Sequence, residues 1–321
     1  MKKIGRILIY VVVIALLVII TAVSYVTLAL PNVGEPENIK IAITPERVAR
    51  GKYLATNVSM CMDCHSNYEW TKPGEAIPAD VLGSGGRVFD EAAGLPGTIY
   101  SPNITPYKLA GWTDGEIFRA ITTGVRKDGS ALFPIMQWPY YSKMDREDLY
   151  SIIAYLRTLN PVKTKDYPKT SLNFPLNLLV HTMPHKAPLG VLPSPADKLA
   201  YGAYLANAAV CRECHSKDDK GTLIPGKEFS GGREFKIGGK SYFSANITSD
   251  KTTGIGTWTA DIFVQYFKSR GDTTKQVKGA VQLTDSPMPW YHYSGMKEGD
   301  LRAIFAYLHT IKPISNKVVN N

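Results

Sequence analysis

Beyond residue 43, the chain reads as one unit written twice. The pentapeptide Cys61-Met62-Asp63-Cys64-His65 returns 150 residues later as Cys211-Arg212-Glu213-Cys214-His215. The flanking motifs keep their order: Gly-x-Tyr-Leu-Ala at 51–55 and 202–206, Gly-Gly-Arg at 85–87 and 231–233, Asn-Ile-Thr at 103–105 and 246–248, and Trp-Thr at 112–113 and 258–259. The offset between the copies stays between 143 and 152 residues, which a few loop insertions explain. We therefore infer a duplicated domain.

Each unit ends in a predicted amphipathic helix. Apolar residues recur at i, i+3, i+4, i+7 and i+10, the spacing of one helix face, at Leu149, Ile152, Ile153, Leu156 and Leu159, and again at Leu301, Ile304, Phe305, Leu308 and Ile311. Pro161 and Pro313 end these helices. Shorter helical patterns cover 115–124 and 260–270, and the glycine- and proline-rich sequence between the helices predicts loops rather than a sheet. The expected fold class is mainly α, with two tandem helical domains.

These patterns divide the chain into five segments. We expect an N-terminal anchor with its juxtamembrane segment at 1–43, a first domain at 44–160, a linker at 161–196, a second domain at 197–313 and a tail at 314–321. The linker holds seven prolines, which favour extended, semi-rigid backbone. Its apolar residues, Phe174 and Leu176 among them, predict that it packs on a domain surface.

The chain is basic, with 37 Lys and Arg against 28 Asp and Glu, but the charge is spread out. Residues 44–160 hold 12 basic and 13 acidic side chains, whereas 197–313 hold 16 and 12. Because no lysine- or arginine-rich block is present, we expect no nucleic-acid partner.

Residues 7–30 form a stretch of 24 residues without a charge. A helix of this length spans about 36 Å, enough for the hydrocarbon core of a bilayer. Lys2, Lys3 and Arg6 precede the stretch, so the positive-inside rule places the N-terminus in the cytoplasm and the rest of the chain outside. The alternative is a cleaved signal peptide, for which this apolar stretch is long.

The Cys-x-x-Cys-His pentapeptide is typical of c-type haem attachment. Two cysteines three residues apart can each form a thioether to a vinyl group at one porphyrin edge, and the next histidine then reaches the iron. The motifs use all four cysteines, Cys61, Cys64, Cys211 and Cys214, and place His65 and His215 as the first axial ligands. A shared zinc site leaves the two histidines unexplained, and a redox dithiol expects a strand-to-helix context.

A methionine about 70 residues after each histidine is our candidate for the sixth iron ligand. Met136 and Met288 both lie in proline-rich segments that precede the final helix, where stiff backbone can hold a thioether in place. The competitors are Met144 and Met296, which suit an apolar position at the start of that helix, and His292 for the second iron.

At these motifs each unit resembles a class I cytochrome c domain. The succession Asn-Ile-Thr, Trp, Met-x-Trp or Met-Pro-Trp and a final Ala-Tyr-Leu helix is similar to the cytochrome c subunits of membrane-bound alcohol and gluconate dehydrogenases. The resemblance covers most of 44–313, but those subunits carry three haem motifs and this chain carries two.

The resemblance also implies roles for smaller motifs. It implies that the haem propionates are contacted by Arg87, Arg233, Asn103, Thr105, Asn246 and Thr248. It implies that Trp112 and Trp258 form walls of the haem pockets. It also implies that the first and last helices of each unit meet through tyrosine pairs, Tyr53 with Tyr155 and Tyr204 with Tyr307.

The expected function is electron transfer by a membrane-anchored dihaem cytochrome c, in which two covalently bound haems with histidine and methionine ligands relay single electrons in a respiratory chain. We expect the protein to lie in the bacterial inner membrane, with the haem domains on the periplasmic side. We expect its redox partner to be a quinol-oxidising complex, a dehydrogenase or a terminal oxidase. The alternative is the cytochrome subunit of a dehydrogenase complex. A dihaem peroxidase needs a vacant or displaceable ligand, so we expect no catalytic residues and no enzyme.

Overall fold

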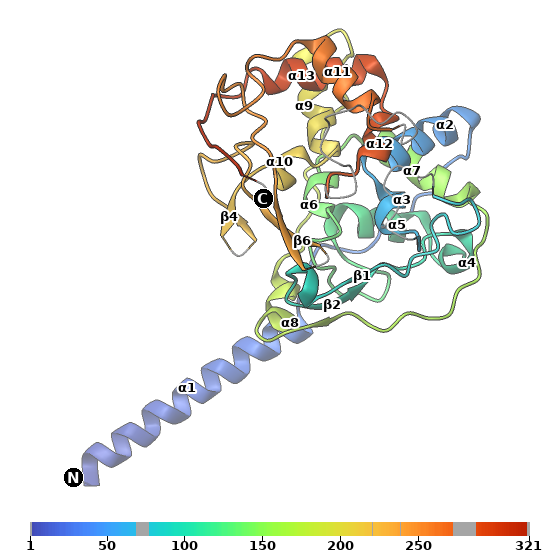
Figure 1. Cartoon of the computed structure of the whole chain (residues 1–321). Helices are drawn as coiled ribbons and strands as arrows, with labels where there is room; N and C mark the ends of the chain where they lie inside the picture. The colour runs from blue at the N-terminus through green and yellow to red at the C-terminus, as the bar shows by residue number, and fades with distance from the viewer. Residues whose placement is uncertain (1, 69–76, 220, 238, 272–286, 320–321) are drawn as a thin grey trace.

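The computed structural model describes residues 2–68, 77–219, 221–237, 239–271 and 287–319, which include every candidate site residue. The chain is mainly helical, as predicted, with a long N-terminal helix attached to two helical units (Figure 1). The element order of the first unit returns in the second, from an opening helix through the cysteine motif to a closing helix.

Helix α1 (Lys2–Leu28) stands alone and projects away from the two units (Figure 1). In the described part of the chain it is the one helix long and apolar enough to cross a membrane. The Thr21 and Thr27 hydroxyls donate to Leu17 O and Val23 O at 2.8 and 2.9 Å within the helix. Their polar groups are therefore satisfied without water, as a lipid environment requires.

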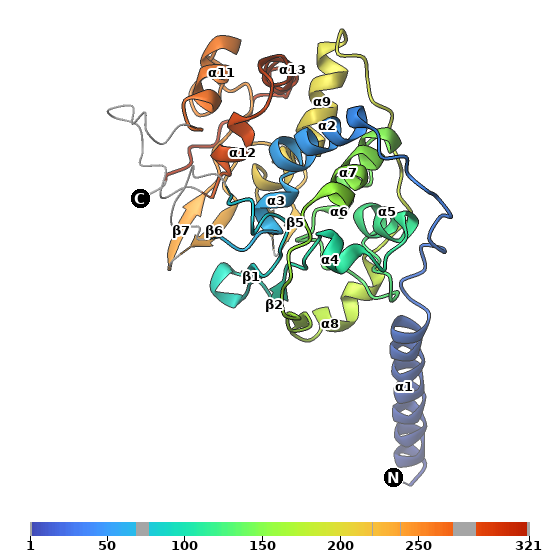
Figure 2. The ribbon, with the colours of Figure 1, turned by 90° about the vertical axis from the view of Figure 1, so that its right-hand side faces the viewer.

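Each unit is built on its opening and closing helices, which cross at a glycine. Helix α2 (Pro45–Tyr53) packs on α7 (Arg146–Thr158), and α9 (Lys198–Ala208) packs on α13 (Glu298–Leu308); Figure 2 shows α2 beside α7. A Cβ atom at Gly51 would lie 1.8 Å from Ser151 O, and one at Gly202 would lie 1.9 Å from Ala303 O. The repeated glycine is thus required by the close approach of two helix backbones.

The other predicted helices are present. Helix α5 (Asp114–Thr123) begins at a capping box in which Thr113 and Glu116 each bond to the backbone of the other, and α11 (Ala260–Lys268) begins at a Thr259 cap. The remaining helical elements are short: η1 (Leu54–Val58), α3 (Cys61–Cys64), η2 (Glu91–Ala93), α4 (Pro106–Leu109), α6 (Trp138–Tyr141), α8 (Leu176–Leu179), η3 (Val180–Thr182), α10 (Cys211–Cys214) and α12 (Trp290–Ser294).

The expectation of loops without a sheet was wrong in detail, because small antiparallel sheets lie between the helices. Three strands pair in the order β1 (Val88–Phe89), β2 (Gly97–Tyr100), β3 (Ser171–Leu172). Two hairpins follow: β4 (Asp218–Asp219) with β5 (Thr222–Leu223), and β6 (Glu234–Ile237) with β7 (Lys240–Phe243). Strands of two to four residues are too short to show a sustained alternation in sequence.

The linker runs along the first unit, which confirms the prediction that it packs on a domain surface. Strand β3 adds to the first unit's sheet, and the Tyr167 hydroxyl donates to Ser84 O at 3.1 Å. Further on, Gly190 N donates to Met144 O at 3.2 Å. Helix α8 also contacts the end of α1 (Figure 1), so the linker lies where the long helix meets the first unit.

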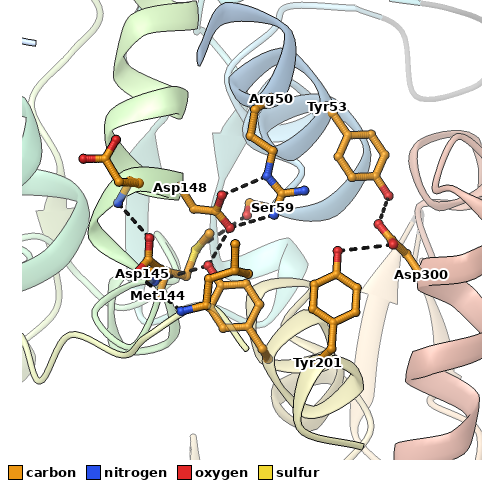
Figure 3. Close-up of polar contacts among 11 residues, drawn as sticks. Arg50, Tyr53, Ser59, Met144, Asp145, Asp148, Tyr201 and Asp300 are labelled. Atoms are coloured by element: carbon orange, nitrogen blue, oxygen red, sulfur yellow. Dashed lines mark hydrogen bonds and ion pairs between the residues drawn. The ribbon is translucent and has the colours of Figure 1, made fainter. Parts of the chain in front are cut away.

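Paired hydrogen bonds join the two units (Figure 3). The Tyr53 hydroxyl donates to Asp300 Oδ2 at 2.5 Å, and the Tyr204 hydroxyl donates to Asp148 Oδ2 at 2.6 Å. Asp148 also receives two hydrogen bonds of 2.8 Å from the Arg50 guanidinium. The hydroxyls of Tyr53 and Tyr204 thus reach the closing helix of the other unit. The expected pairs Tyr53 with Tyr155 and Tyr204 with Tyr307 stay predictions.

Arg157, in the last turn of α7, connects this helix to the segment before α5. Its guanidinium donates to Asp114 Oδ1 at 2.8 and 3.0 Å and to the carbonyls of Leu109 and Trp112 at 2.7 and 2.6 Å. We expect Arg157→Ala to lower the free energy of unfolding by about 2–4 kcal/mol, because it leaves several partly buried acceptors without a donor.

Chemical denaturation of the holoprotein measures this loss. Arg302→Ala is the matched control, since its bond to Asp261 lies on the surface and we expect less than about 1 kcal/mol there. Equal losses for the two variants would contradict the role given to Arg157.

Candidate haem sites

Each cysteine motif forms one helical turn, α3 or α10, entered through a residue in the left-handed region: Met60 with φ 51° and Val210 with φ 57°. The four cysteines are half-buried and form no disulfide. Burial raises the pKa of Cys61 and Cys211 to about 12, and that of Cys64 and Cys214 to about 11. The thiols are thus neutral, unlike the low-pKa thiol that a redox dithiol uses.

The two motif histidines have the same backbone partner in both units. His65 Nδ1 lies 2.8 Å from Pro102 O, and His215 Nδ1 lies 2.8 Å from Ala245 O. A carbonyl accepts only, so each Nδ1 carries the proton and each Nε2 keeps its lone pair. Burial lowers the pKa of both imidazoles, which favours the neutral ring. A neutral histidine oriented by a carbonyl is the form in which histidine binds a metal.

The Gly-Gly-Arg segment closes over each histidine. Gly85 N donates to His65 O at 2.8 Å, and Gly231 N donates to His215 O at 2.7 Å. Both glycines have positive φ, 70° and 73°, and a Cβ atom on Gly85 would lie 2.4 Å from Asn103 N. These glycines are required because the backbone passes close to the loop that holds the histidine's partner.

The arginine of this segment pairs with the acidic residue inside the cysteine motif. Arg87 Nη1 lies 3.0 Å from Asp63 Oδ2, and Arg233 donates to the Glu213 carboxylate and, at 2.8 Å, to Glu213 O. The side chains therefore lie at the motif, each beside a cysteine. Their pairing with haem propionates stays a prediction.

Asn103 and Asn246 use both ends of their amides within the protein. The Asn103 oxygen accepts from Thr105 N and Oγ1 at 2.8 and 2.7 Å, and the Asn246 oxygen accepts from Thr248 N and Oγ1 at 3.0 and 2.7 Å. Their nitrogens donate at 2.8 Å to Val162 O and Ile314 O, which follow the closing helices. Each amide thus connects the Asn-Ile-Thr loop to the segment that follows the closing helix of its unit. Contacts of these side chains with haem propionates stay predictions.

Burial separates the methionine candidates. Met136 and Met288 are half-buried against the core, at the turns that lead into α6 and α12. Met144 and Met296 are 0% and 1% exposed, and the Ser59 hydroxyl lies 3.9 Å from Met144 Sδ. The second pair therefore fills the core, which leaves Met136 and Met288 as the sulfur ligands to propose.

The two tryptophans predicted as pocket walls are half-buried in equivalent places. Trp112 packs against the core, and its carbonyl accepts from Arg157. Trp258 packs on Tyr266 and Phe263, with ring centroids 4.9 and 6.5 Å apart. A wall position is compatible with this packing and stays a prediction.

Two side chains reach the cysteine motif of the other unit, a role that the sequence analysis did not give them. The Tyr140 hydroxyl of α6 donates to Glu213 Oε2 at 2.7 Å, and His292 Nε2 of α12 lies 3.2 Å from Asp63 Oδ1. His292 Nδ1 lies 2.8 Å from Thr56 O. Both nitrogens of His292 thus face the first unit, which argues against His292 as a ligand to the second iron.

No group of three or more His, Cys, Asp and Glu in the described residues could hold a metal ion, and the zinc alternative requires one. The residues instead fit a haem in each unit: two neutral thiols, a histidine whose Nδ1 is held by a carbonyl and whose Nε2 keeps its lone pair, and a half-buried methionine before α6 or α12.

Comparison with known proteins yields relatives but no matching family model. The chain is 27% identical over 300 residues to the cytochrome c subunit of the alcohol dehydrogenase (quinone) of Gluconacetobacter polyoxogenes, covering 85% of this chain and 58% of that protein. It is 29% identical over 296 residues to the fructose dehydrogenase cytochrome subunit of Gluconobacter japonicus, covering 85% and 55%. The chain therefore spans a little over half the length of these dehydrogenase subunits.

A third relative has nearly the same length as this chain. It is a diheme cytochrome c-type protein of Cereibacter sphaeroides, 27% identical over 308 residues that cover 93% of this chain and 96% of the relative. The resemblance predicted from the sequence is confirmed: the chain is similar to the cytochrome c subunits of alcohol, fructose and gluconate dehydrogenases and to a diheme cytochrome c.

Proposed function

We propose that this protein transfers electrons as a membrane-anchored dihaem cytochrome c. The observation that carries the proposal is the repeated histidine geometry, in which His65 and His215 each turn Nδ1 toward a loop carbonyl at 2.8 Å and leave Nε2 for an iron. The haem, when bound, supplies reversible one-electron chemistry at its iron.

The chain's own residues hold that group and set its properties. Cys61 and Cys64, or Cys211 and Cys214, would hold the haem covalently, and the adjacent histidine with Met136 or Met288 would be its protein ligands. A methionine ligand would raise the reduction potential of the haem. Because the chain itself would supply these ligands, we assign it no catalytic residues.

Helix α1 anchors the two haem units at the inner membrane, on its periplasmic side. Its length and composition support this placement, as do the basic residues that precede its apolar stretch. Redox proteins at that surface, such as a quinol-oxidising complex, a dehydrogenase or a terminal oxidase, are the proposed partners.

The second candidate is a cytochrome subunit bound to one catalytic dehydrogenase. Several relatives carry such names, which favours it. The diheme cytochrome c-type relative, 27% identical over 93% of this chain, supports the free relay. Stoichiometric co-purification of a dehydrogenase from the native membrane would decide for the second candidate.

Intact mass and spectroelectrochemistry test the main proposal. We expect protein matured with cytochrome c maturation machinery to carry two haem masses and to take up two electrons reversibly. The double variant Cys211→Ser/Cys214→Ser is expected to carry one. An unmodified polypeptide from such cells would overturn the proposal.

A further inference from the structure

The residue that follows each candidate methionine by four positions reaches the cysteine motif of the other unit. Tyr140 contacts Glu213, and His292 contacts Asp63, in the same positions of the repeat. A second matched pair supports the arrangement: Asn57 Nδ2 donates to His292 O at 3.0 Å, and Asn207 Nδ2 donates to Tyr140 O at 2.9 Å. Two pairs of equivalent contacts therefore join α6 and α12 to the opening segment and cysteine motif of the other unit.

The two equivalent side chains differ in charge. His292 is 2% exposed, and both ring nitrogens face acceptors, Thr56 O at 2.8 Å and Asp63 Oδ1 at 3.2 Å. Since Tyr68 and Arg87 also donate to Asp63, its carboxylate is an acceptor here. Because Nδ1 donates to Thr56 O, a neutral ring would turn the Nε2 lone pair toward the Asp63 carboxylate, whereas an imidazolium presents an N–H to both acceptors. Tyr140 makes its contact through a neutral hydroxyl.

We propose that His292 is a positioning residue of the first haem site supplied by the second unit, and that its buried positive charge raises the potential of that haem above the value its own unit would set. The inference rests on the proposed function. A charge inside the protein acts more strongly than one in water, and a cation favours the added electron. The interface between the units is therefore also a device that makes the two haems unequal.

The test is His292→Tyr in the full-length holoprotein, because tyrosine is the residue that the first unit uses at this place. The variant keeps a donor for Asp63 and loses the charge. We expect the electron-sharing equilibrium between the haems to shift about tenfold away from the first haem, which is about 59 mV in its midpoint potential. Met136→Ala and Met288→Ala variants assign the two midpoints.

Two further variants separate charge from packing. Asp63→Asn removes the carboxylate that holds the charge on His292, so both charges of the pair are lost and the first haem's potential is expected to shift much less than in His292→Tyr, whereas loosened packing would shift it as far in both variants. Tyr140→Phe removes a neutral contact at the equivalent place and is expected to shift the second haem by less than about threefold. Thermal denaturation of each variant measures any loss of folding.

An unchanged potential of the first haem in His292→Tyr with both haems attached would overturn the inference, as would equal shifts of both haems. Absence of haem from the unmodified protein would instead contradict the proposed function, and intact mass distinguishes the two failures.

Discussion

Met136→Ala and Met288→Ala are each expected to lower the midpoint potential of one haem and leave the other unchanged. Loss of the thioether removes the ligand that we propose to favour the reduced iron, and we expect a fall on the order of 0.1 V within the roughly 0.8 V range that axial ligands span. Spectroelectrochemical titration measures the fall, and loss of the methionine–iron charge-transfer absorption of one haem accompanies it.

The buried methionines provide matched controls. Met144→Leu and Met296→Leu keep the apolar volume of the core and are expected to retain the charge-transfer absorption of both haems. If instead Met144→Leu removed the absorption of the first haem and Met136→Ala did not, the ligand assignment in that unit would be wrong.

Gly51→Ala is expected to destabilise the protein more than an ordinary surface substitution. The added Cβ atom would meet Ser151 O at 1.8 Å, so α2 and α7 must separate or shift along each other. We expect a loss of about 3 kcal/mol or more in the free energy of unfolding, and a similar loss for Gly202→Ala, whose Cβ atom would meet Ala303 O at 1.9 Å.

Gly299→Ala is the internal control for these variants, because it makes the same replacement in a helix where a Cβ atom meets nothing within 4 Å. There the alanine is expected to stabilise the helix by up to about 1 kcal/mol. Denaturant titration of the three holoproteins measures the differences. A Gly51→Ala protein as stable as Gly299→Ala would show that the helices do not cross as described.

The helices and the cofactor motifs were predictable because their signals are local. The apolar spacing of 149–159 gives a helix over Arg146–Thr158, and the Thr113 cap with Glu116 defines the start of α5. The short strands were not predictable, because strand β1 has two residues and gives no periodic signal. The partners of His65 and His215 were hidden for another reason: they are backbone carbonyls, which every residue carries.

The contacts between the units were missed because sequence periodicity tells which face of a helix is buried, and not what covers it. The tyrosines at 53 and 204 were expected to contact their own closing helices, and their hydroxyls reach Asp300 and Asp148 of the other unit. A signal was present: acidic residues stand at 63 and 213, and hydrogen-bond donors stand at 140 and 292, in equivalent places of both copies.

The contacts between the halves are reciprocal, as in a homodimer with an axis of twofold rotation, where residue i of one subunit meets j of the other and j meets i. Here the two subunits share one polypeptide, so each face is free to diverge from its mate without losing the geometry. A symmetric dimer would have two identical electron carriers with no preferred direction between them. Because the halves share one chain, one position holds tyrosine and the other holds histidine, and the charge proposed for His292 would give the pair a polarity.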